Sequence, residues 1–237
     1  MNPSYFIMRG PSDPKIIGVK DGGSQVQIYR EGFSDKSNYD KYHDFFAERD
    51  SSIWSKLDKI PDFDFTLECV RQRKGAKLTD FLVYYPEAFG ANFLMSEKAV
   101  RVLEQHNLPR HKKYPAKVYI NEKEFILYQL VYFPTLSYDT VNFPNSIFYR
   151  GSELTGKEYL KINSSEEYEK VSSKSVFNIE ELSLAKGFDD NLDIFNTKVT
   201  YEFIISSKLK EAIVKEKLTG INLIEAKGPR HMSIVTE

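Results

Sequence analysis

One pattern occurs twice in this 237-residue sequence. FLMSEKAVRVLEQHNL (93–108) and FIISSKLKEAIVKEKL (203–218) each place three apolar residues and a serine before apolar residues at helical spacing. Ser96 and Ser206 are typical helix N-caps, because a serine oxygen accepts hydrogen bonds from the free amides of the first turn. Strand-like segments follow, AKVYI and INLIEA, so the pattern predicts two strand-helix-strand units in one core. Four identities in sixteen positions leave coincidence as the alternative.

The rest of the chain predicts mixed elements. We expect strands at 5–9, 15–20, 25–30 and 63–70, and a hairpin that joins 116–120 to a central strand at 125–133. We expect helices from an N-cap at Asn38 towards Trp54 and Leu57, at 78–85, after Ser164 with Glu167 as its capping-box partner, and in the two repeats, which end at Pro109 and Gly220. These elements predict an α+β fold with a largely antiparallel sheet, in a single domain over 1–237 with a possible sub-region at 1–77.

Composition narrows the class of protein. Lys and Arg number 33 against 34 Asp and Glu, so no global charge draws the chain onto nucleic acid or membrane. Cys69 is a single cysteine on the apolar side of an alternating segment, which indicates a buried thiol in a reducing compartment. No signal-peptide core or apolar run of membrane-spanning length is found, and a cytoplasmic location is expected.

The sequence contains no recognisable catalytic motif. Its four histidines, His43, His106, His111 and His231, form neither a helical metal pair nor a cluster with Cys69, and His106 and His111 are expected to be solvated. Glycine motifs for nucleotides and the elbow motif of hydrolases do not occur. We therefore predict no catalytic residue, no metal and no cofactor, and keep an enzyme of unrecognised type as an alternative.

Two basic turns offer a further alternative. Residues 71–77 and 110–113, if joined in space, would form a phosphate-binding patch and a nucleic-acid-binding module; the favoured interpretation is two solvated turns. These turns consist of Arg71, Arg73, Lys74 and Lys77, and of Arg110, His111, Lys112 and Lys113.

An acidic segment with aromatic residues lies at 187–196. Phe188, Asp189, Asp190 and Asp193 suit a buried contact centre with a polar rim, and they are the predicted partner-contact residues. The alternative is that the aromatic residues pin the loop to the core and the acids are solvated. Reversing Asp189 and Asp190 to lysine is expected to weaken partner binding.

From Leu78 onward the order of segments resembles a family of bacterial immunity proteins that protect cells from polymorphic or contact-delivered toxins. The resemblance spans most of 78–224 and lies in KLTDFL, FLMSEKAVRVLEQ, YPAKV, TVNFPNSIFY and DIFNTKVTYEFIISSKLKEAIVKEKLTGI. It implies a non-enzymatic inhibitor that neutralises a toxin domain by stoichiometric binding. The expected partner is that toxin, with no nucleic acid and no membrane; the oligomeric state stays open.

Overall fold

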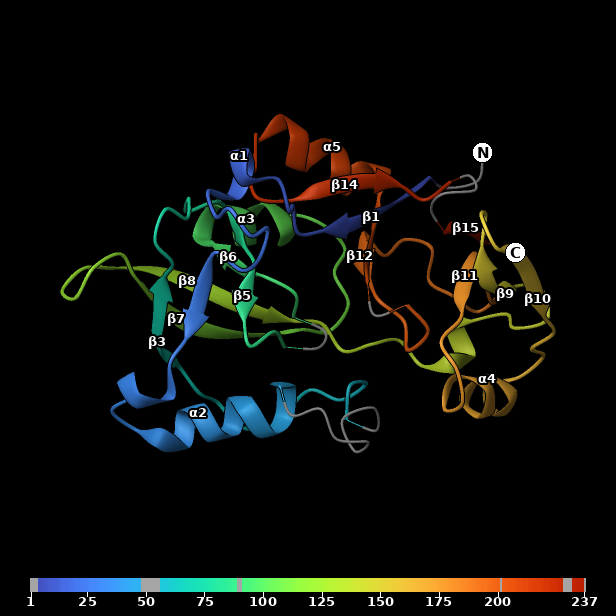
Figure 1. Ribbon diagram of the computed structural model, residues 1–237, viewed down its shortest axis with the longest axis horizontal. Helices are drawn as coiled ribbons and strands as arrows, with labels where there is room; N and C mark the ends of the chain where they lie inside the picture. Colours follow the sequence, from blue (N-terminus) through green and yellow to red (C-terminus); the bar gives the residue numbers. More distant parts are fainter. Residues whose placement is uncertain (1–3, 48–55, 89–90, 201, 228–231, 237) are drawn as a thin grey trace.

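The computed structural model of the protein describes residues 4–47, 56–88, 91–200, 202–227 and 232–236. These residues form three β-sheets with helices packed beside them (Figure 1). Helices and mainly antiparallel sheets both contribute, so the predicted α+β class is confirmed.

The largest sheet has seven strands in the order β4-β6-β8-β7-β3-β2-β5. Its strands are β2 (Val26–Ile28), β3 (Leu67–Gln72), β4 (Phe81–Leu82), β5 (Tyr84–Tyr85), β6 (Leu94–Ser96), β7 (Lys112–Tyr119) and β8 (Phe125–Tyr132). β7 and β8 form the predicted hairpin, and β8 lies between β6 and β7. One face packs against α2 (Lys36–Tyr42) and the π-helical turn that continues it (His43–Ala47), and the other face packs against α3 (Glu97–Leu103).

A second sheet has the order β12-β13-β1-β14 and is antiparallel throughout. Its elements are β1 (Tyr5–Arg9), β12 (Ile194–Phe195), β13 (Phe203–Ser206) and β14 (Asn222–Glu225), with α5 (Ser207–Lys215) between β13 and β14. β1 therefore lies between two strands from the far end of the chain. Figure 1 shows this as a blue strand beside orange and red ones.

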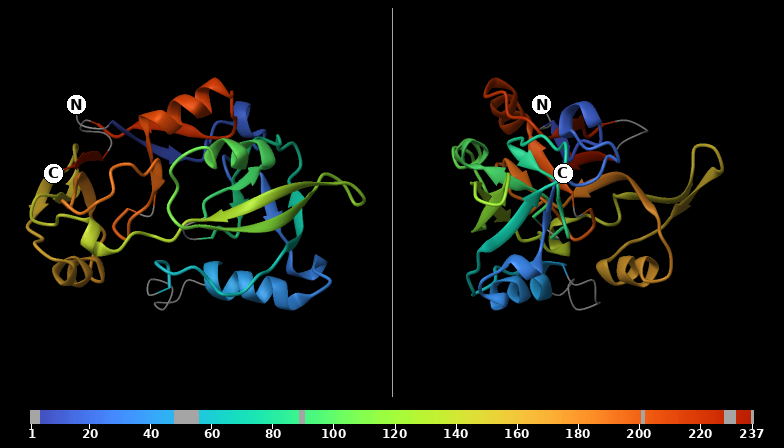
Figure 2. Two further views of the ribbon diagram at one scale, coloured as in Figure 1. Left: turned by 180° about the vertical axis from the view of Figure 1, so that it is seen from behind. Right: turned by 60° about the vertical axis from the view of Figure 1, so that its left-hand side comes forward.

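The third sheet, in the order β10-β9-β11-β15, lies at one end of the molecule with α4 (Figure 2). These elements are β9 (Ile147–Ser152), β10 (Gly156–Leu160), α4 (Ser165–Ser172), β11 (Asn178–Leu184) and β15 (Ser233–Thr236). Ser164 Oγ accepts a hydrogen bond from Glu167 N, as predicted, while the Glu167 carboxylate accepts from Asn163 N. Parallel pairing occurs in β2–β5, β3–β7 and β11–β15.

Two strands each serve two cores. In β1, Ile7 packs towards the third sheet, whereas the next residue, Met8, packs beneath α3 and α5. In β8, Leu130 faces the core beside α2, and Val131 faces the core beneath α3 and α5. Because side chains alternate across a strand, the sheets that contain β1 and β8 each have apolar residues on both faces and each separate two cores.

The doubled segment is a structural repeat. β6-α3-β7 encloses β8 in the order β4-β6-β8-β7, and β13-α5-β14 encloses β1 in the order β12-β13-β1-β14. Each serine caps its helix as predicted, Ser96 by accepting from Ala99 N and Ser206 by accepting from Leu209 N. The middle strand follows its unit as a hairpin in the first copy but is supplied by the N-terminal segment in the second.

Two aspartates brace the repeat. Asp80 accepts from Ser96 Oγ (2.8 Å) in its own unit and from Thr219 N (2.9 Å) after α5. Asp193 accepts from Ser206 Oγ (2.6 Å) in its own unit and from Asn107 N (2.9 Å) after α3. Each carboxylate thus joins the start of one repeat helix to the loop that follows the other.

Two secondary-structure predictions near the N-terminal half were wrong. Residues 15–20 do not form a strand, because Asp13 and Pro14 start a helical turn, α1 (Pro14–Ile17), that Gly18 ends at φ 82°. Residues 78–85 do not form a helix but supply β4 and β5, whose side chains enter cores on both sides of the sheet. The apolar residues of 78–85 also fit a helical spacing. Burial on both faces of the sheet removes the alternation of apolar and polar residues that would have indicated strands.

Several boundaries also moved. The N-cap of α2 is Asp35 and not Asn38, Leu57 lies in a turn, and Trp54 falls outside the described residues. β3 begins at Leu67, so only the second half of 63–70 is a strand. The repeat helices end at Leu103 and Lys215, before Pro109 and Gly220.

Candidate functional site

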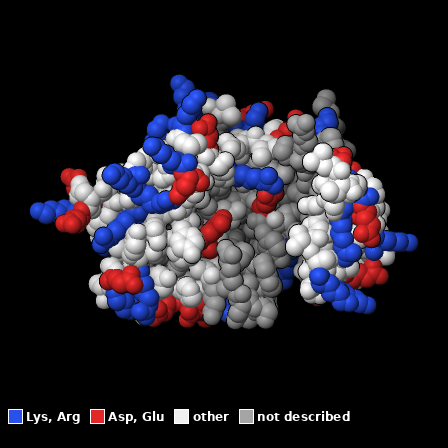
Figure 3. Space-filling view, in the orientation of Figure 1, with Lys and Arg blue, Asp and Glu red and all other residues white. Residues whose placement is uncertain are grey.

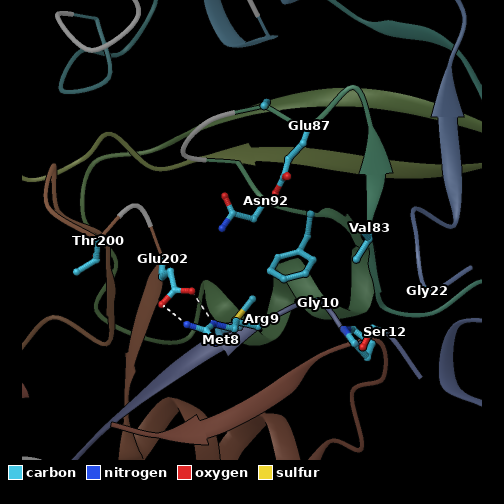
Figure 4. Close-up of a pocket in the computed structure, with 13 residues that line it drawn as sticks. Met8, Arg9, Gly10, Ser12, Gly22, Val83, Glu87, Asn92, Thr200 and Glu202 are labelled. Atoms are coloured by element: carbon cyan, nitrogen blue, oxygen red, sulfur yellow. Dashed lines mark hydrogen bonds and ion pairs between the residues drawn. The ribbon is translucent and has the colours of Figure 1, made fainter. Parts of the chain in front are cut away.

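A cleft of about 400 Å³ opens where the end of β1 meets the chain that enters β13 (Figure 4). Apolar side chains of Met8, Val83 and Phe93 form part of its wall, and Glu87 and Asn92 add polar groups. This volume is within the range of small-molecule sites. The cleft therefore combines an apolar wall with polar groups.

Arg9 and Glu202 form a two-point ion pair at the edge of this cleft. Arg9 Nε lies 2.5 Å from Glu202 Oε1, and Arg9 Nη2 lies 2.9 Å from Oε2. The hydrogen bonding that Arg9 donates to the Glu202 carboxylate raises the pKa of Arg9 above its ordinary value, against the effect of burial. Both carboxylate oxygens accept from Arg9, so this ion pair joins the end of β1 to the residue before β13.

The described histidines have partners within four residues of them in the sequence. His106 Nδ1 lies 2.9 Å from Val102 O, and His111 Nδ1 lies 3.0 Å from Pro109 O. His43 is partnered by Asp44, and His231 lies outside the described residues. Within the part of the chain that the structure describes, no group of three or more His, Cys, Asp or Glu side chains could hold a metal ion.

The two basic turns lie at opposite ends of β7. Lys112 starts this strand, whereas Arg71 pairs in register with Tyr119 at its other end. Seven steps of about 3.3 Å separate the turns by roughly 23 Å. Three of their cations bind acids of this chain: Arg73 pairs with Asp21, Lys112 with Asp64 and Lys113 with Glu104. The turns therefore form no single patch, which agrees with the favoured sequence interpretation.

The four residues predicted as partner contacts separate into two kinds. Asp193 is 3% exposed, and its carboxylate already binds Ser206, Asn107 and Lys208. Burial alone would raise the pKa of Asp193, but these hydrogen bonds together lower it. Phe188 packs on Phe195 with ring centroids 4.8 Å apart.

Asp189 and Asp190 are the exposed members of the segment. Asp189 Oδ1 accepts from Asn191 N within the turn. Contact of this segment with a partner stays a prediction, now limited to these two carboxylates. The alternative drawn from the sequence, in which aromatic residues pin the loop to the core, fits Phe188, whereas Asp193 is buried and not solvated as that alternative expected.

Sequence reasoning missed one surface. The run 125–133 is buried from Tyr128 onward, but Phe125, Ile126 and Leu127 are 44%, 43% and 57% exposed. Apolar residues at the tip of a hairpin carry the same local pattern as those in its buried half. The flanking polar turn, 121–124, was the available signal that the strand reaches solvent there.

No family model matches this chain, and a search of the curated proteins gives no match. No helix among the described residues is both long and apolar enough to span a membrane.

Proposed function

We propose that this protein is an immunity protein that neutralises a bacterial toxin by forming a stoichiometric complex with it. The observation that carries the proposal is the structural role of the segments that resemble the immunity family. FLMSEKAVRVLEQ and FIISSKLKEAIVKEKL build the two braced units, and their conspicuous serines accept helix amides and donate to Asp80 and Asp193. Because these serines are engaged in helix capping and in hydrogen bonds to the two aspartates, their role supports a scaffold and not a nucleophile.

A braced scaffold suits an inhibitor. Binding costs less free energy when the contact face is already ordered, because fewer side chains and loops lose freedom in the complex. A face of about 800 Å² on each partner is sufficient for a stable complex. The inhibitor would act in the cell that makes the toxin, so we also propose a cytoplasmic location.

Co-expression tests the proposal. An immunity gene is expected to lie beside the gene of its toxin. A toxin domain encoded there should arrest growth alone and be tolerated with this protein, and the purified pair should elute as a one-to-one complex. A protein that leaves the toxin active and forms no complex contradicts the proposal. A chemical activity of the purified chain on a small substrate would favour the alternative of an unrecognised enzyme.

A further inference from the structure

The β7–β8 hairpin extends past the strand that flanks it. β6 pairs with β8 at Ser96–Tyr128, Met95–Gln129 and Leu94–Leu130, and α3 then leads the chain away. Residues 125–127 of β8 have no strand on that side among the described residues. Figures 1 and 2 show the hairpin tip projecting from the body of the protein.

The register leaves backbone groups unpaired along this edge. Ile120 N donates to Glu124 O, so 120 and 124 form a hydrogen-bonded pair of the hairpin. Hydrogen-bonded and non-hydrogen-bonded pairs alternate in antiparallel strands. The N–H and C=O groups of Phe125 and Leu127 therefore point away from β7, towards the open edge. Such an edge is a template for another strand.

Aromatic rings and cations alternate across the sheet from the hairpin to the end of β2. The Phe125 ring lies 5.5 Å from the Tyr119 ring, and Lys117 Nζ lies 5.7 Å from the centre of the Phe125 ring. On the neighbouring strand, Arg71 Cζ lies 5.7 Å from the centre of the Tyr29 ring. We call Tyr29, Arg71, Lys117, Tyr119, Phe125 and Leu127 the hairpin face.

The hairpin face keeps its positive charge. Arg71 and Lys117 make no direct ion pair with any acid in the described part of the chain, whereas nearby Arg73 is paired with Asp21. Hydrogen bonding with Cys69 raises the pKa of Arg71 first, and Glu122 of the hairpin turn lies near enough to contribute, so Lys117 carries the clearer unpaired charge. At the hairpin turn, the Glu124 carboxylate accepts from Asn121 Nδ2. Figure 3 shows Lys and Arg side chains gathered on this side of the molecule, with both basic and acidic side chains at the projecting tip. The face is complementary to an acidic, apolar partner.

We propose that the hairpin face is the toxin-binding surface, and that an extended acidic segment of the toxin adds to the open edge of β8 as a further strand. This inference rests on the proposed function. Backbone pairing at Phe125 and Leu127 would supply affinity, and Lys117, on the strand next to β8, would favour acidic side chains. The free amides beside the exposed Leu127, with Arg71 and Lys117 as the cations of the face, match a peptide strand better than a nucleic acid, whose recognition needs many phosphate contacts.

Binding to the inactivated toxin domain encoded beside this gene tests the inference, with calorimetry on the full-length chain. Leu127→Asp should weaken binding about 100-fold or more, and Lys117→Glu about tenfold. Val214→Asp is the matched control, because Val214 on α5 is 59% exposed and Leu127 is 57% exposed. The double reversal Asp189→Lys/Asp190→Lys tests the rival acidic segment. These two controls should stay within about threefold of the wild-type affinity. Circular dichroism melting confirms that each variant folds.

Each other result overturns the inference in an identifiable way. A folded Leu127→Asp variant that binds like the wild type excludes the edge, and a loss confined to the Asp189/Asp190 variant assigns the contact to 187–196. A wild-type chain that fails to bind the toxin removes the proposed function and this inference with it. Tight, salt-sensitive binding of a labelled single strand of about 20 nucleotides, lost in Lys117→Glu, would assign the face to nucleic acid. A homodimer in sedimentation that Leu127→Asp separates would assign the edge to a second copy.

Discussion

Asp80 and Asp193 hold equivalent positions in the two strand-helix-strand units. Each precedes a short strand, binds the serine that caps the helix of its own unit, and accepts an amide from the loop after the helix of the other unit. The backbone repeats the relation, since Ser96 N donates to Asp80 O and Ser206 N donates to Asp193 O. The two units therefore hold one another, and the shared core beneath α3 and α5 depends on both carboxylates.

Replacing Asp193 should destabilise the whole fold. Asp193→Asn places an amide N–H₂ or a neutral oxygen where a buried carboxylate accepts from Ser206, Asn107 and Lys208. We expect a loss of about 2–4 kcal/mol in the free energy of unfolding, measured by urea denaturation. Asp190→Asn, at an exposed position, should change it by about 0.5 kcal/mol or less. Equal effects of the two substitutions would contradict the brace.

The same carboxylate should make stability depend on acid pH. Its pKa is lowered in the folded protein, so it binds a proton more readily when unfolded, and its contribution is present above the unfolded-state pKa of about 3.9. That contribution is lost as pH falls from there through the lowered folded-state pKa. In urea titrations between about pH 5 and 2.5, Asp193→Asn should lose less stability than the wild type. Parallel pH profiles would show that Asp193 does not titrate with unfolding.

The two capping serines should respond alike to removal. Ser96→Ala and Ser206→Ala each delete an acceptor for a helix amide and a donor to a carboxylate, and each should cost about 1–2 kcal/mol of unfolding free energy. Ser164→Ala removes the cap of α4 and a hydrogen bond to the Glu166 carboxylate, but Glu166 is exposed to solvent, so this substitution should cost less. If Ser206→Ala left the free energy of unfolding unchanged while Ser96→Ala lowered it, the two capping serines would not contribute equally to stability.

Three glycines separate backbone strain from crowding. Gly220 and Gly156 have φ values of +88° and +87°, but a Cβ at Gly220 would lie 2.2 Å from Phe81 O, and one at Gly156 meets nothing within 4 Å. Gly156→Ala should cost about 1–2 kcal/mol, from the left-handed conformation alone. Gly220→Ala should cost clearly more, because the loop must also shift away from β4. Gly187→Ala, with open space and no positive φ, is the control and should be nearly neutral in thermal unfolding.

Local patterns determined much of this protein. Helix capping by Ser96, Ser164 and Ser206, the strand at Tyr5–Arg9 and the β7–β8 hairpin were all predictable, because each depends on residues a few positions apart. The burial of Cys69 followed from its place in an alternating segment. For the candidate surfaces, the acids of 187–196 and the two basic turns could be located from the sequence, as solvated or structural groups. Their hydrogen-bond and ion-pair partners could not.

Tertiary structure alone decided the rest. It made strands of 78–85, because Phe81 and Leu82 found partners in β6, and it placed β1 between β13 and β14 across nearly the whole chain. It turned Asp193 inward to Ser206 and left Leu127 outside. Propensity and periodicity describe a residue's near neighbours, whereas burial and hydrogen-bond partners depend on which distant segments arrive beside it, and that is fixed only when the whole chain packs.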